Sequence, residues 1–157
     1  MYRDAYSGRL KLDGEQHLET LQAASNYANA LLNLKRFEEA KALLRKSVPT
    51  VRRVLGENDQ LTLKMRKIYA RALYEDASAT LDEIREAVKT LEDTERVARR
   101  VLGGSHPLTL AIECDLRKAR ATLQFSLEAR EAGFDSISEA LASLPTDLLA
   151  AMKAGGA

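Results

Sequence analysis

The sequence predicts an all-α protein, and within that class an α-solenoid of antiparallel helix hairpins. Charged residues make up 30% of the chain and apolar ones 45%, while aromatics account for only 5%, a balance that favours helices over strands. Apolar residues recur at i, i+3 and i+4, the spacing of one helix face. A short segment headed by Gly14, Gly56 and Gly103 also occurs three times, at intervals of 42 and 47 residues. An internal repeat of this length is typical of stacked helix pairs.

Each copy of the repeated segment predicts the end of one helix and the start of the next. The glycine can adopt the left-handed conformation that ends a helix, and His17, Asp59 or His106 follows three residues later in the capping position. For the two histidines we weighed capping against metal binding or acid–base chemistry. We favour capping, because no second ligand follows them with a spacing such as His-x3-His.

Residues 1–12 predict the end of a helix. Laid 42 positions further on, Met1 to Tyr6 coincide with the middle of the second helix of the first full repeat. The chain therefore begins inside a repeat, either as a piece of a longer solenoid or with a lone turn retained as an N-terminal lid. A first helix is expected from about His17 to Leu34 and a second from Phe37 to Leu55, which Pro49 should bend or deprive of one hydrogen bond.

The second repeat has the same pattern with an insertion. Tyr69 and Ala70 fall 42 residues after Tyr27 and Ala28, but the next helix, from about Leu81 to Leu102, is displaced by five further positions. We therefore expect the insertion near residues 76–82, either in the loop or as an extra turn of the second helix.

The third unit predicts a long capping helix. Pro107 suits its first turn, Gly133 suits its end, and Arg117 stands where the earlier repeats have a small residue. A second apolar line on this helix needs a cover, and we expect the tail to supply it, with Ser136 as a cap and Pro145 as a break. That line comprises Leu110, Cys114, Ala121 and Phe125.

These boundaries predict two regions. A solenoid over residues 1–132 would comprise a partial repeat (1–13), two repeats (14–55 and 56–102) and a capping helix (103–132). An amphipathic helical tail over residues 133–157 would follow, with Gly155, Gly156 and Ala157 frayed at its end.

The arrangement resembles the tetratricopeptide repeats of the 42-residue, kinesin light chain-like type over residues 1–123. The resemblance rests on the links at Leu55-Gly56 and Leu102-Gly103, on Asn26-Tyr27-Ala28, and on Arg36-Phe37-Glu38-Glu39-Ala40. It implies a scaffold that binds proteins or peptides on the concave surface formed by the first helices. An asparagine that such repeats use to hold a peptide backbone is present as Asn26, but Ile68 and Asp115 replace it later.

Several functional classes are disfavoured. The formal net charge of +1 gives no overall attraction to nucleic acid, and acidic residues interleave with the basic pairs, so a mixed-charge surface is preferred to an RNA-binding solenoid. No apolar run is long enough for membrane insertion, and the reducing cytosol is the default compartment. Cys114 is interpreted as a small core residue rather than a nucleophile. No catalytic constellation, cofactor loop or metal-ligand pattern is present, so we expect no enzyme and no cofactor.

The polar side of the first helices is the candidate partner-binding site. Its amides and cations suit an extended or helical peptide that bears acidic groups, although an ordinary solvated helix surface has the same composition. The candidate residues are Gln22, Asn26, Asn29, Asn33, Lys64, Lys67 and Arg71.

The functional expectation is a non-catalytic adaptor or assembly subunit that binds a protein or peptide partner. In an alternative, the tail, with Leu141, Leu144, Leu148, Leu149 and Met152, docks into its own groove or that of another copy, so that it regulates access or forms a homo-oligomer.

Overall fold

The computed structural model describes residues 1–154, and at 149, 152 and 153 it describes the backbone alone. This part of the chain is all-helical and contains no strand. In order, the helices are α1 (Tyr2–Asp13), α2 (Leu18–Asn33), α3 (Phe37–Leu55), α4 (Gln60–Tyr74), α5 (Leu81–Leu102), α6 (Pro107–Glu131), α7 (Ile137–Ala142) and α8 (Thr146–Ala154).

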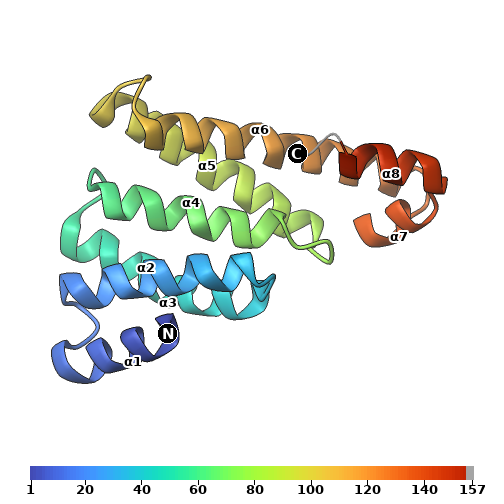
Figure 1. Cartoon of the computed structure of the whole chain (residues 1–157). Coiled ribbons are helices and arrows are strands. Elements are labelled where there is room, and N and C mark those ends of the chain that lie inside the picture. The colour runs from blue at the N-terminus through green and yellow to red at the C-terminus, as the bar shows by residue number, and fades with distance from the viewer. Residues whose placement is uncertain (155–157) are drawn as a thin grey trace.

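Consecutive helices from α1 to α6 pack against one another, and α4 also packs against both α2 and α6 (Figure 1). The first helices α2, α4 and α6 therefore lie side by side, while α3 and α5 form the second layer. This two-layer stack is consistent with a repeat solenoid of the predicted class.

Two apolar clusters hold the stack together. One joins α2, α3 and α4 through fully buried residues such as Ala28, Leu44 and Ile68, and the other joins α4, α5 and α6 through Leu73, Leu91 and others. Because α4 contributes to both clusters, neither hairpin buries its apolar stripe alone.

The insertion in the second repeat is divided between a loop and a helix. The turn between α2 and α3 has three residues, whereas that between α4 and α5, residues 75–80, has six; α5 is 22 residues long and α3 is 19. Thr80 and Glu83 form a reciprocal capping box that starts α5 after the longer loop. The expected position of the insertion is confirmed, and both expected forms of it occur.

Helix α3 runs continuously through Pro49. Because proline has no backbone N–H, the helix lacks the hydrogen bond that residue 49 would donate to the carbonyl of Arg45.

The expectation that the tail covers the second apolar line of α6 is wrong. Leu110 is 50% exposed and Ala121 is exposed, and only Phe125 joins a cluster with the tail residues Ile137 and Leu141. Helix α7 has six residues, about 9 Å of helix, and cannot span the four turns from 110 to 125. It covers the end of the α5–α6 pair instead. Leu148 of α8 is 51% exposed, and the side chains of 149 and 152 and the expected frayed end at 155–157 lie outside the described residues.

Candidate functional site

The three repeat links cap helices. Asp59 Oδ1 accepts a hydrogen bond from the Leu61 N–H at 2.8 Å, and the Nδ1 atoms of His17 and His106 accept from the N–H two residues further on. At Gly56 the backbone angles are φ 86° and ψ 171°, with the same conformation at the other two link glycines. That region is open essentially to glycine alone. The prediction that both histidines cap helices is confirmed.

A groove runs along the N-terminal ends of the three first helices, and we call it the first-helix groove. It crosses from α2 over α4 to α6, so both full repeats and the capping helix contribute to it. Its walls combine leucine and proline side chains with amides, one histidine, one lysine and Asp59, whose Oδ1 caps α4. The lining residues are Leu18, Gln22, Asp59, Gln60, Leu61, Lys64, His106, Pro107 and Leu108.

Two of the seven candidate residues, Gln22 and Lys64, line the first-helix groove. They occupy equivalent positions 42 residues apart, and both are exposed. Asn29 and Asn33 lie further along the same face of α2, two and three helical turns from Gln22, with Asn33 exposed and Asn29 half-buried. Among the described residues, Lys64 contacts no carboxylate at ion-pair distance, which leaves its charge available to a ligand.

The other two candidate cations already contact carboxylates within the fold. Lys67 Nζ lies 3.6 Å from Asp115 Oδ2 on the next first helix, and Arg71 Nε donates to Glu75 Oε1 at 2.8 Å. Burial by itself would lower the pKa of Arg71, but the hydrogen bond and charge of Glu75 and the charge of Asp115 raise it above its ordinary value. Lys67 therefore joins α4 to α6, while Arg71 pairs with the C-cap residue of its own helix.

Asn26 occupies a position that faces a neighbouring helix in the other repeats. Its equivalents, Ile68 on α4 and Asp115 on α6, are 2% and 6% exposed, each covered by the preceding first helix. No such helix precedes α2 in the described structure, so Asn26 is exposed and lines a second groove, between α1 and α2.

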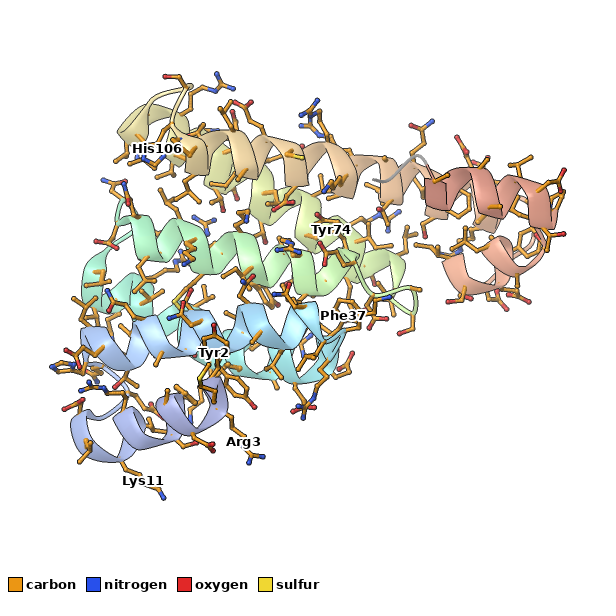
Figure 2. All side chains as sticks on the ribbon, in the orientation of Figure 1. Tyr2, Arg3, Lys11, Phe37, Tyr74 and His106 are labelled. Carbon is orange, nitrogen blue, oxygen red and sulfur yellow. The ribbon has the colours of Figure 1, made fainter. Side chains whose placement is uncertain are left out.

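Sequence reasoning missed the role of Asp115. Its Oδ1 accepts a hydrogen bond of 3.2 Å from the hydroxyl of Tyr74, and its Oδ2 faces Lys67 (Figure 2 labels Tyr74 at this interface). Burial, together with the nearby negative charges of Asp115 and Glu75, raises the pKa of Tyr74 well above its ordinary value, so the phenol remains a donor. The sequence did contain a signal for this role, because Asp115 is a charged residue at a position where the preceding repeat has the apolar Ile68.

A buried lysine was also missed. Lys41 of α3 is 2% exposed and contacts Glu38, Glu83 Oε1 at 2.9 Å and Asp76 Oδ2 at 3.8 Å. Burial alone would lower the pKa of Lys41, but hydrogen bonds to Glu38 and Glu83 raise it. This cation joins the first repeat to the inserted loop of the second.

The structure brings two carboxylates to His17. Ligand atoms of Asp13, His17 and Glu19 all lie within 4.8 Å of one another, an arrangement that the sequence spacing did not suggest. Arg9 Nη1 contacts both carboxylates, and His17 Nδ1 already accepts the Glu19 N–H. The group is accounted for as an ion-pair network around a helix cap.

The basic pairs contact acidic residues. Lys46 lies 2.8 Å from Glu15, Arg52 contacts Glu57, and Arg99 contacts Glu95. These contacts fit the interpretation of a mixed-charge surface. Cys114 is half-buried rather than part of the core. Among the described residues, no helix is both long and apolar enough to cross a membrane.

Residues 20–60 match a family model described as the tetratricopeptide repeat, of the kinesin light chain type. The match covers α2, α3 and the link to α4, which carry the motifs on which the resemblance rests, except for the link at Leu102-Gly103. Searches of curated proteins and of solved structures each returned no match.

Proposed function

Because residues 20–60 match a tetratricopeptide repeat, we propose that this chain is a non-catalytic protein–protein interaction module, acting as an adaptor or as an assembly subunit. Its partner binds on the face formed by α2, α4 and α6, the concave face in solenoids of this type. A repeat of this kind suggests protein partners in general; the location of the site and the chemistry of the ligand are parts of the proposal.

The observation that supports this location is the continuity of the first-helix groove across three repeats. A groove that crosses three helices suits an extended or helical segment better than it suits a compact small molecule. A helix or strand lying in it would contact the N-terminal turns of α2, α4 and α6 together.

The chemistry of the groove favours a segment with an acidic group flanked by apolar side chains. Lys64 can donate a charge-assisted hydrogen bond, and the amides of Gln22 and Gln60 stand beside it. Leu18, Leu61 and Leu108 provide apolar contacts on both sides. Of the seven candidate residues, Gln22 and Lys64 would touch the ligand most directly, with Asn29 and Asn33 extending the polar face along α2. Lys67 and Arg71 would support α4.

Substitution of Lys64 tests this proposal. We expect Lys64→Glu to weaken binding of a fluorescent 12-residue peptide of alternating leucine and glutamate about tenfold, near 1.4 kcal/mol, with a smaller effect at high salt. A leucine–glutamine peptide should be insensitive to the substitution. Lys89→Glu, an equal charge change at an exposed position of α5, is the matched control. Equal affinity of the Lys64→Glu and Lys89→Glu variants would contradict the proposed site.

The binding site of the natural partner can be located by comparing the groove face with the exposed face of α5. A photo-crosslinking residue at position 60, which lines only the first-helix groove, should capture a protein from the source cells, and one at position 89 should not. Capture from position 89 alone would place the binding site on the opposite layer.

A further inference from the structure

The groove between α1 and α2 lies at the N-terminal edge of the stack, where the repeat pattern would place a further helix. In the two complete interfaces, a preceding first helix covers Met65 and Ile68 on α4 and Ile112 on α6, all of which are at most 2% exposed. The equivalents of Met65 and Ile68 on α2 are Ala23, which is half-buried, and Asn26, which is exposed. The face of α2 that these positions define is therefore built for contact with another helix.

Helix α1 forms the other wall of this groove and has no buried residue. Met1 is 92% exposed and Leu12 is 80% exposed. The position of Tyr2 on α1 corresponds to that of Leu44 on α3, which is fully buried, yet Tyr2 is 47% exposed. Figure 2 shows Arg3 and Lys11 pointing away from α2, so these two cations do not face the groove.

The repeat pattern sets the direction that a helix bound in this groove would take. Within each hairpin the first and second helices are antiparallel, and successive first helices run the same way (Figure 1). A helix that fills the groove must therefore run antiparallel to α1 and parallel to α2. A second copy of α1 placed antiparallel to the first meets both conditions.

The α1 residues that line the groove are complementary to themselves in this orientation. An antiparallel pair centred between residues 6 and 7 places Met1 against Leu12 of the other copy, Asp4 against Arg9, and Ala5 against Gly8. Each pairing is favourable: apolar with apolar, acid with base, and small with small, so that the two backbones can approach closely. All six residues line the groove.

Asp4 can make this contact freely, whereas Arg9 would have to share its guanidinium with Asp13 and Glu19 of its own chain. Asp4 has only weak contacts within its own chain, at 3.7 Å to Arg3 and 3.9 Å to the N-terminal ammonium. Arg9 meets its intrachain carboxylates through Nη1, and no intrachain contact is made by its Nε or Nη2 among the described residues.

We propose that the groove between α1 and α2 binds α1 of a second copy, giving a two-fold symmetric dimer whose centre is a bundle of two α1 and two α2 helices. A two-fold axis repeats every contact, so each favourable pair occurs twice. Asn26, on the α2 wall, would be covered by the partner's α1, as its equivalents are covered within the chain. This dimer is independent of the first-helix groove, which lies on other residues except for Gln22.

Sedimentation velocity over a range of concentrations tests the dimer on the whole 157-residue chain. We expect concentration-dependent dimerisation, which Asp4→Lys should weaken by at least about tenfold because it places a lysine against an arginine twice. Arg9→Glu should weaken it similarly by placing a glutamate against an aspartate. An equimolar mixture of the two variants should form a heterodimer, because both cross pairs then carry opposite charges. Asp82→Lys, at a position 94% exposed on α5, is the matched control.

The outcomes distinguish the alternatives. A monomer at all concentrations, or a dimer that is insensitive to Asp4→Lys, would overturn the proposal. Loss of the dimer in Leu148→Glu, with Asp4→Lys unchanged, would assign self-association to the tail instead and would overturn it equally. Circular dichroism on each variant confirms that helicity is retained, and failure of the mixture to dimerise while both variants stay folded would also contradict the pairing.

Discussion

The two interfaces between neighbouring first helices share a geometry but differ in chemistry. Between α2 and α4, the central position is Ile68, packed in an apolar cluster. Between α4 and α6, the equivalent position is Asp115, held by Tyr74 and Lys67. The residues 42 positions before Tyr74 and Lys67 are Leu32 and Ser25. The comparison teaches that a repeat interface accepts a buried carboxylate when the facing helix carries both donors.

The largest expected effect on stability comes from placing the carboxylate of the α4–α6 interface into the α2–α4 interface without its partners. Ile68→Asp should destabilise the fold by about 4 kcal/mol or more, because it buries a carboxylate opposite Leu32 and Ser25, which offer it neither a cation nor a phenol hydroxyl. Urea unfolding monitored by circular dichroism measures this change. Adding Leu32→Tyr and Ser25→Lys should recover part of the loss. If the single variant unfolds at the same urea concentration as the wild type, the residues of the facing helix do not determine whether a buried carboxylate is tolerated.

A smaller effect is expected from removing the carboxylate. Asp115→Ala should cost about 2 kcal/mol, since the Tyr74 hydroxyl and the Lys67 ammonium lose their acceptor while partly regaining water. Asp115→Asn keeps an acceptor for Tyr74 and should cost less. The same urea experiment compares the two variants. An Asn variant less stable than the Ala variant would argue against the hydrogen bond from Tyr74.

The smallest effect concerns the second-layer contact between the repeats, where Lys41 meets Glu83. Burial would raise the pKa of Glu83, but hydrogen bonds from the Thr80 N–H and from Lys41 lower it below its ordinary value of 4.5. Since the folded pKa is lowered, its stabilisation is full above about pH 4.5 and is lost as pH falls through the folded value.

This contact gives a pH-dependent prediction. Glu83→Gln should lower the unfolding temperature by a few degrees at pH 7 and by less at pH 3, because the stabilisation that comes from the lowered pKa of Glu83 diminishes as the pH falls below 4.5. Glu131→Gln, at an exposed position of α6 that makes no ion pair among the described residues, is the control. An equal loss at both pH values would show that the charge of Glu83 is not what stabilises the contact.

Most of the fold could be predicted because its signals are local and repeated. Glycines, caps and apolar spacing place the helix ends near the observed ones, and the five extra residues locate the altered loop. The course of the tail could not be predicted in the same way. Helix α7 was expected along α6 from its apolar residues alone, but its position depends on long-range packing against Ala79 and Ile84, which no periodicity reveals.

The arrangement of the candidate residues could be predicted less completely than the fold. Helical spacing placed Gln22 and Lys64 on one face, and the structure puts both in one groove. Spacing does not show which cation already has a carboxylate beside it, so Lys67 and Arg71 resembled free charges in the sequence. Asn26 lies outside this groove and lines the groove between α1 and α2, which helical spacing within α2 does not reveal.

The half-buried thiol of Cys114 has a practical consequence. Cys114 follows Pro107 of the first-helix groove by seven residues, two helical turns, and so lies on the same side of α6. It is also the single cysteine of the chain. A maleimide dye can therefore be attached to the native sequence at one defined place beside the groove. Its fluorescence would report partner binding without mutagenesis.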